Sequence, residues 1–415
     1  MANELLTTQL IANEALLQLK NNLVMAKLVH RDYEDTFEKE GATIRVRRPI
    51  RYTVRTNMTS SAQDVKEGDV SVSLGKVAGV DFGFTSTELT LDIERFSERY
   101  LTPGVIEIAH RIDRDIAEMY KYVANWSWRG TNPSATTRID SFDDYAAGPE
   151  RLDENAVPVS DRSGVLAPAD YWGIAGSLTA LQADRKAISA LEKAKVGTFA
   201  NTDTYSTAQV WEHTVGASGS PGVTLNTSTQ VSTYETVMST TPIQATYTFS
   251  GTAAVTGYFA AGDVITIADV FDINPRTGQR IGGRLKQFVV LATTNTTATT
   301  FTMPISPAII PTGPYKNVEL VSAGSKAVTR VGTAATQYRQ NMVFHKNAFA
   351  LVVRPLVLPP GSVDGARATD SQTGLSVRVI PYYTGSTDTS VWRLDVLYGV
   401  APVYPELATR LTAGA

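Results

Sequence analysis

The stretch from Gly262 to Val290 reads GDVITIADVFDINPRTGQRIGGRLKQFVV and has the pattern of a compact β unit. A run rich in β-branched residues opens it, Asn274-Pro275 predicts a turn, and a second apolar run closes it. We expect this unit to have a hydrophobic core of its own. The residues expected to supply that core are Val264, Ile265, Ile267, Phe288 and Val289.

The composition around this unit differs from that of both flanks. Lys and Arg are absent from Val196 to Pro275, whereas Thr and Ser are abundant, as in TLNTSTQVSTYETVMSTT at Thr224 to Thr241. Because Val, Ile, Phe and Tyr recur throughout, this composition favours short strands in a sandwich or barrel over disorder. A helix-like pattern returns at Gln340 to Leu351. The sequence therefore predicts a β module inserted into an α/β domain.

The overall composition excludes several classes of protein. The chain has 415 residues, enough for two or three domains, and its 38 basic and 41 acidic residues give a net charge of −3. Bulk charge therefore does not favour binding to DNA or to an anionic membrane. Cysteine is absent, which excludes disulfides and thiolate metal sites. Neither a signal peptide nor a membrane span is recognisable, so we expect a cytoplasmic protein.

Two segments have helical periodicity. From Asn3 to about Val29 an apolar stripe predicts an amphipathic helix, which could pack equally well on its own domain or on a neighbouring chain. Thr102 is the expected cap of a second helix, and the stripe from Pro103 to Ala124 predicts a straight helix of about 33 Å. We expect Ile112 and Ile116 to form the buried face of this second helix.

A strand with one basic face is predicted at Ala42 to Arg55, ATIRVRRPIRYTVR, and a second extended run at Gly68 to Leu74 completes a long hairpin. Its basic face could be solvated or could meet acidic groups on another subunit. The arginines of that face are Arg45, Arg47, Arg51 and Arg55. Arg276 and Arg280, the first basic residues after the segment that lacks Lys and Arg, raise the same two alternatives for the loop from Asn274 to Gly283.

No pattern of catalytic or metal-binding residues is present in the sequence. The four histidines are scattered, and there is no HExxH motif, phosphate-binding loop or nucleophile elbow. Asp269, Asp272 and Asn274 fall at positions 1, 4 and 6 of a loop, whereas an EF-hand needs ligands at 1, 3 and 5. We therefore expect no enzymatic activity, no cofactor and no metal.

Five ordered blocks of sequence resemble one family, the major capsid (coat) proteins of tailed double-stranded DNA bacteriophages typified by Salmonella phage P22. The blocks are Val80 to Tyr120, Arg162 to Tyr171, Val196 to Gly216, the opening stretch at Gly262, and Asn341 to Gly361. They span nearly the whole chain in order.

The resemblance implies an α+β chain with the Hong Kong 97 capsid fold and an inserted β-barrel domain. The implied parts are an N-terminal arm at 1–40, an E-loop hairpin at 41–89, a peripheral domain with its spine helix at 90–140, an axial domain at 141–216 and 338–415, and the inserted barrel at 217–337. These boundaries are expectations from the family.

The function implied is that of a major capsid protein, which self-assembles into the icosahedral shell around the phage genome. Its partners would be further copies of itself in hexamers and pentamers, a scaffolding protein, a portal protein and a decoration protein, with packaged DNA contacted only non-specifically and no membrane. Its location would be the virion capsid, assembled in the bacterial cytoplasm. The Thr-rich centre leaves one alternative, a β-rich surface-layer or adhesin-type structural protein.

Overall fold

The structure is a computed structural model that describes residues 8–31, 43–52, 54, 58, 64–85, 101–178, 198–199, 201–226, 230–320, 324–359, 365–370 and 375–414. The chain divides into two compact units. The first consists of Met1–Ile44, Val72–Ile116 and Ala350–Ala401, and the second of Arg45–Ser71, Ala117–Phe349 and Pro402–Ala415. Both units are therefore built from segments that are far apart in the sequence.

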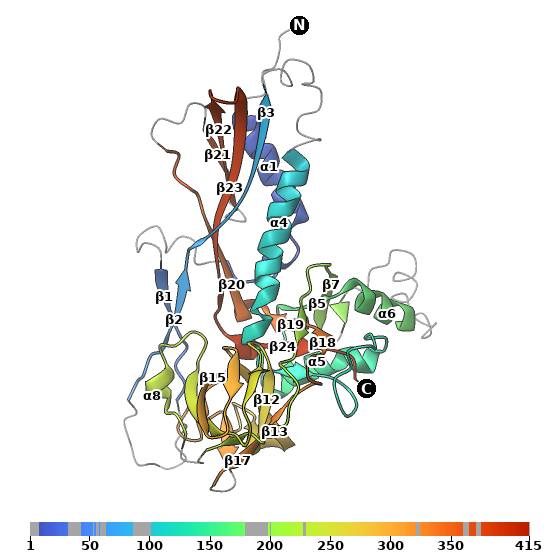
Figure 1. Cartoon of the computed structure of the whole chain (residues 1–415), viewed down its shortest axis with the longest axis vertical. Helices are drawn as coiled ribbons and strands as arrows, with labels where there is room; N and C mark the ends of the chain where they lie inside the picture. The colour runs from blue at the N-terminus through green and yellow to red at the C-terminus, as the bar shows by residue number, and fades with distance from the viewer. Residues whose placement is uncertain are drawn as a thin grey trace. The chain divides into compact units, whose positions relative to one another are not determined.

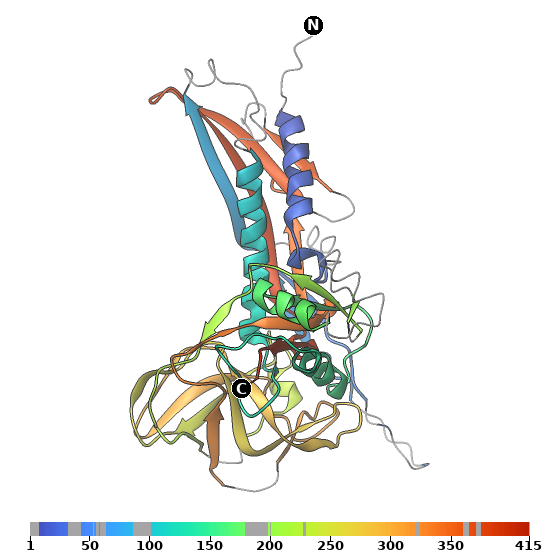
Figure 2. The same cartoon turned by 90° about the vertical axis from the view of Figure 1, so that its right-hand side faces the viewer.

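The first unit combines an antiparallel sheet with two helices. Its strands are β3 (Lys76–Thr85), β20 (Phe349–Arg354), β21 (Ala366–Thr369), β22 (Ser376–Thr384) and β23 (Thr389–Pro402). Their order is β20-β23-β22-β21, and β3 also pairs with β23, from Thr389 opposite Thr85 to Tyr398 opposite Lys76. Helices α1 (Thr8–Asn22) and α4 (Thr102–Ala117) run along the length of the strands (Figures 1 and 2).

The N-terminal helix packs on its own unit, against β21 and β22. Its buried residues are Ile11, Ala12, Ala15 and Leu19. A 3-10 turn, η1 (Met25–Lys27), follows it and is held by α4, because Asp113 accepts hydrogen bonds from the backbone N–H groups of Val24 (2.7 Å) and Ala26 (3.0 Å). Of the two placements considered for this helix, the structure therefore shows packing within the chain.

The second predicted helix is shorter than the sequence pattern indicated. The α-helix ends at Ala117, and the apolar stripe continues through a 3-10 segment, η3 (Glu118–Tyr122), to Val123. Sixteen α-helical residues correspond to about 24 Å rather than 33 Å. The stripe alone could not locate this change, because i and i+3 neighbours lie on the same side in both helix types.

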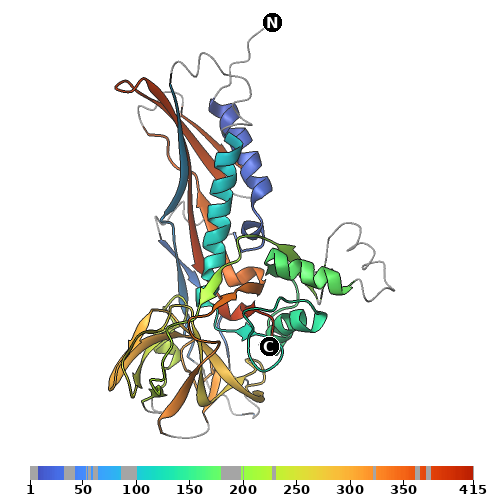
Figure 3. The same ribbon diagram turned by 45° about the vertical axis from the view of Figure 1, so that its right-hand side comes forward.

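In the second unit a six-stranded mixed sheet carries two helices. Its order is β4 (Trp126–Ser127), β24 (Ala408–Leu411), β19 (Asn341–His345), β5 (Arg162–Leu166), β7 (Thr202–Ser206) and β6 (Thr198–Phe199). Helices α5 (Phe142–Glu154) and α6 (Pro168–Leu178) lie beside it (Figure 3). Ser141 caps α5, since its Oγ accepts from the Asp144 N–H at 3.1 Å. Tyr145 of α5 and Ile174 of α6 share a core with Val343.

The helix expected at Gln340 to Leu351 is wrong. This segment forms β19, whose five residues are all buried, the 3-10 turn η5 (Lys346–Ala348) and the start of β20. A short, nearly continuous apolar run suits a strand buried on both faces as well as a buried helix, so periodicity does not separate them. The structure also groups Ala350–Ala401 with α4 and β3, whereas the sequence placed these residues with 141–216.

The Thr-rich segment contains a closed six-stranded barrel. Its order is β13 (Arg280–Val290), β15 (Thr300–Ser306), β10 (Ala245–Ser250), β9 (Thr224–Leu225), β17 (Lys326–Arg330) and β12 (Val264–Ile273), and pairing of β12 with β13 closes it. β16 (Val318–Leu320) extends the second half of β12. Smaller elements are α8 (Tyr234–Val237), β11 (Val255–Phe259) with β14 (Thr294–Thr296), and β8 (Glu212–Thr214) with β18 (Gln337–Arg339).

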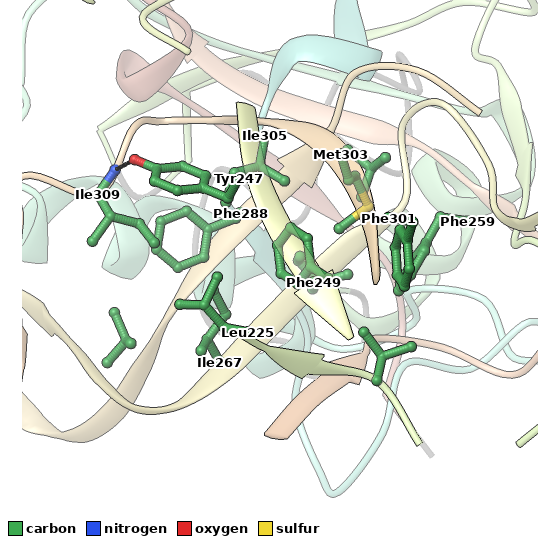
Figure 4. Packing of buried hydrophobic residues seen from close by; sticks show 14 of the residues in the cluster. Leu225, Tyr247, Phe249, Phe259, Ile267, Phe288, Phe301, Met303, Ile305 and Ile309 are labelled. Atoms are coloured by element: carbon green, nitrogen blue, oxygen red, sulfur yellow. Dashed lines mark hydrogen bonds between the residues drawn. The ribbon is translucent and has the colours of Figure 1, made fainter. Parts of the chain in front are cut away.

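The barrel interior is filled by aromatic and branched side chains, many of which Figure 4 shows, with Phe249 and Phe288 among them. The Tyr247 hydroxyl accepts a hydrogen bond from the Ile309 N–H at 2.7 Å. Ile265 and Ile267 point into this core, whereas Val264 belongs to a different cluster, with Trp126, Val215, Val331 and Tyr338. Val264 is thus buried, but on the outer face of the barrel, where it joins the barrel to the host sheet.

Candidate functional site

The basic face of the hairpin is paired within the chain. β1 (Thr43–Arg47) and β2 (Asp69–Ser73) form a two-stranded sheet. Arg45 lies 3.5 Å from Asp69, and Arg47 lies 3.1 Å from Glu67. Both arginines stay mostly exposed, 76% and 82% of their side chains, so a second carboxylate could still reach them. Arg55 falls outside the described residues.

One arginine that the sequence pattern did not single out anchors the hairpin on the barrel. Arg48 is only 5% exposed, and its Nη2 donates to the Thr240 carbonyl at 3.0 Å. The Ser71 N–H donates to Thr241 Oγ1 at 2.9 Å. Arg51 remains exposed, and its backbone N–H donates to the Tyr315 hydroxyl at 3.1 Å. The doubled arginine at 47 and 48, which interrupts the alternation, was the only sequence signal of this anchor.

A buried ion pair fixes the barrel to helix α5. Asp272 of β12 lies with Oδ1 2.9 Å from Lys286 Nζ and Oδ2 3.0 Å from Arg151 Nη2. Burial alone would raise the pKa of Asp272, but Lys286 and Arg151 outweigh burial and hold that pKa below its usual value. Burial lowers the pKa of Arg151 to about 10, against the opposing effect of Asp272. Both groups are therefore charged at neutral pH.

A second buried polar cluster lies where the barrel meets β24. Arg410 donates from Nε to the Val123 carbonyl (2.8 Å) and from Nη1 to the Gly262 carbonyl (2.7 Å). Beside it His213 Nε2 lies 2.7 Å from Asp263 Oδ1. Burial, with a contribution from Arg410, lowers the pKa of His213 despite Asp263. The His213 and Asp263 side chains are almost wholly buried, so the pair has no access to a substrate and acts in packing.

The loop between β12 and β13 carries the two arginines predicted from the sequence. Arg276 is exposed. Arg280 Nη2 lies 2.8 Å from Glu319, and its guanidinium stacks over the Phe271 ring at 4.4 Å. The structure therefore gives Arg280 partners within the barrel.

In the first unit Ile112 and Ile116 of α4 are wholly buried. Polar groups on the same helix tie it to the sheet, because Asp115 accepts from Lys76 Nζ at 2.7 Å and from the Tyr398 hydroxyl at 2.9 Å. α4 therefore has an apolar and a polar attachment to its unit.

The described residues contain neither a metal-binding cluster nor a membrane-spanning helix. There, no group of three or more His, Asp or Glu side chains could hold a metal ion. Within the same residues, no helix is long and apolar enough to cross a membrane.

Several solved structures are similar to this chain. A chain from Mycobacterium phage Che8 matches with a TM-score of 0.50 and 13% identity, covering 94% of this chain and 90% of that one. The capsid of cyanophage P-SCSP1u matches with a TM-score of 0.43 and 9% identity over 90% and 84% of the two chains. The mature capsid of bacteriophage PhiM1 gives 0.41 and 9% over 90% and 83%. No curated protein matches the chain.

The long helix on an antiparallel sheet, the mixed sheet and the two-stranded hairpin give the chain a fold of the Hong Kong 97 type. A family model described as P22 coat protein, gene protein 5, matches residues 1–412. The chain belongs to this family. It is a major capsid protein that forms the shell, and the closed barrel lies within its second unit.

Proposed function

We propose that the chain assembles as hexamers and pentamers into an icosahedral shell around a double-stranded DNA genome. Membership of the coat protein family carries this proposal, since the model matches nearly the whole chain. Assembly takes place in the bacterial cytoplasm on a scaffolding protein, and a portal protein occupies one vertex. The work of the chain is structural rather than catalytic.

The charge of the chain supports a container role. With a net charge of −3 the chain has no overall electrostatic attraction for DNA, and phosphate contacts dominate the affinity of DNA-binding proteins. DNA in such a shell is contacted only weakly and without sequence preference. Contacts between subunits that are individually weak can break and re-form during assembly, and their free energies add up over a closed shell.

The test is to express the chain with and without its candidate scaffolding protein and to examine the products by electron microscopy and sedimentation. We expect shells of uniform size with the scaffolding protein, and monomers or aberrant particles without it. A chain that is folded by circular dichroism but never forms shells or capsomers under either condition would contradict the proposal.

We further propose that the exposed arginines of the hairpin and of the barrel loop contact carboxylates of neighbouring subunits. Single exposed pairs contribute roughly 0–1 kcal/mol, so several must be changed together. The first variant replaces Arg45, Arg47, Arg51 and Arg55 by Ser, and the second is Arg276→Glu with Arg280→Glu. Folded monomers that assemble poorly or with altered curvature are expected, and normal shells at physiological salt would argue against these contacts.

The proposed domain division remains that of the family: an arm at 1–40, the E-loop at 41–89, the spine region at 90–140 and the inserted barrel at 217–337. The closed barrel between β9 and β17 supports the last of these ranges. The assignment of 338–415 to the axial domain with 141–216 is supported by β19, which pairs with β5, by β24, which pairs with β19, and by β18, which pairs with β8.

A further inference from the structure

A cavity of about 680 Å³ opens in the second unit. Its lining comes from the base of the hairpin at Arg48–Tyr52, from the barrel and from the turn at Tyr404–Leu407. This volume falls in the ~300–1,000 Å³ range of pockets that enclose a ligand. It is large enough to take several side chains of a peptide.

The charges around the cavity are mostly positive. Arg51, Arg276 and Lys316 line it, and none of them lies within ion-pair distance of a carboxylate of another described residue. Lys286 also lines it but is bound to Asp272. Among the described residues of the lining, Glu406 is the only acid. The cavity therefore has a surplus of positive charge, although Lys316 also acts electrostatically on Glu319.

Tyrosine rings form much of the remaining lining. Tyr234 and Tyr315 stack in parallel, with ring centroids 3.5 Å apart. The Arg51 guanidinium lies 5.8 Å from the centroid of Tyr315, and Tyr52 next to it is 60% exposed. Cations held beside aromatic faces suit a ligand that combines carboxylates with aromatic side chains.

One segment of the sequence has this composition. Residues 32–40 read DYEDTFEKE, with five carboxylates, one lysine, Tyr33 and Phe37, and no other nine-residue stretch of the chain is as acidic. We propose that the cavity is the docking site for residues 32–40 of a second copy of this chain. The carboxylates meet Arg51, Arg276 and Lys316, and the aromatic side chains meet the tyrosines.

The second copy is the occupant that charge complementarity and the capsid function favour together. In a shell each cavity faces a high local concentration of identical chains, so a weak segment-to-cavity contact is populated. Such a contact fixes register between subunits more than it adds affinity. The proposal relies on the capsid function only for the presence of neighbours.

The first test uses the full-length monomer and a labelled synthetic peptide of residues 32–40, followed by fluorescence anisotropy. We expect saturable binding that weakens as salt is added, and about tenfold weaker binding to Lys316→Glu and to Arg276→Glu. The matched control is Arg138→Glu, an exposed arginine outside the cavity, which should bind as the parent does.

A scrambled peptide of identical composition separates recognition of the segment from attraction to any polyanion, and inorganic phosphate tests for a simple anion site. Equal binding of native and scrambled peptides, displacement by millimolar phosphate, or no binding at all would overturn the proposal. Because the titration uses monomers, failure of assembly does not affect its outcome.

The second test exploits the absence of cysteine. Asp35→Cys and Lys316→Cys proteins, each singly substituted, are co-assembled and treated with a short bismaleimide. We expect covalent dimers on denaturing gels, and few with Arg138→Cys in place of Lys316→Cys. The Asp35→Cys, Lys316→Cys double variant tests for a link within one chain. If it forms such a link while the mixed single variants form no dimers, a second copy is excluded as the occupant.

Discussion

Arg151 of helix α5 and Asp272 of strand β12 lie 3.0 Å apart, with their side chains 3% and 0% exposed. They are 121 positions apart in the sequence, and the pair joins the host domain to the barrel. Two charges in a buried site are stable only when each has a partner, because the loss of hydration is large. The attachment of the barrel to helix α5 should therefore be sensitive to removal of either partner.

Removing the carboxylate of this pair tests how strongly it stabilises the attachment of the barrel. In Asp272→Asn we expect a loss of about 3–5 kcal/mol in the free energy of unfolding, because Arg151 and Lys286 would stay buried without a carboxylate. Urea unfolding followed by tryptophan fluorescence measures it. Glu319→Gln, which breaks the half-exposed pair with Arg280, is the control and should cost no more than about 1 kcal/mol. Similar losses of unfolding free energy in the two variants would show that the buried Arg151–Asp272 pair stabilises the fold no more than a half-exposed pair does.

Adjacent arginines of the hairpin should differ sharply. Arg48→Met removes the buried hydrogen bond to Thr240, so we expect a loss of about 1–3 kcal/mol and faster amide exchange in β1 and β2. Arg47→Met, at an exposed position, should change neither quantity measurably. Hydrogen–deuterium exchange with mass spectrometry distinguishes the two, and equal protection in both would show that Arg48 does not anchor the hairpin.

Stability should fall below neutral pH because of His213. Its pKa is lowered in the folded protein, so the unfolded chain binds more protons in this range. The contribution is fully present above the ordinary histidine pKa of about 6.5, and it is lost as the pH falls through the lower folded-state value.

The measurement is the urea midpoint between pH 8 and 5.5. His213→Gln should flatten the dependence, whereas His345→Gln, at a second histidine of lowered pKa, should remove a separate part of it. An unchanged slope in His213→Gln would show that His213 does not titrate with unfolding.

Helix α4 should tolerate loss of volume at Ile112 but not a charge. Ile112→Asp places an unpaired carboxylate in a core, so we expect insoluble or unfolded protein. Ile112→Val should cost about 0.5–1.5 kcal/mol and still assemble. Soluble yield and shell formation are the measurements, and an assembly-competent Ile112→Asp protein would contradict the burial.

Substitutions on the two faces of β12 should distinguish the stability of the barrel itself from its attachment to the rest of the chain. We expect residues 217–337, expressed alone, to fold as a small β domain. Ile267→Thr should destabilise this fragment and the full chain alike, because Ile267 lies in the barrel core. Val264→Thr should destabilise mainly the full chain, where Val264 packs on Trp126. Thermal unfolding followed by circular dichroism, for both variants in the fragment and in the full chain, measures these changes.

Local sequence patterns predicted the elements whose signals are local. The β-branched runs on either side of Asn274-Pro275 became β12 and β13, and the apolar stripes became α1 and α4. The Thr-rich composition without Lys or Arg correctly indicated a barrel or sandwich. The ordered family blocks gave the capsid fold. These signals depend on periods of two or 3.6 residues, which a sequence displays directly.

Only the tertiary structure decided which faces meet. Val264 and Ile265 are equally apolar neighbours, yet one joins the barrel to Trp126 and the other fills the barrel, because successive side chains on a strand point to opposite faces. Asp272, considered only as a failed calcium ligand, became the centre of the barrel's attachment to helix α5 because folding brought Arg151 to it. Pairing of charges this distant depends on chain topology, which no local pattern of residues records.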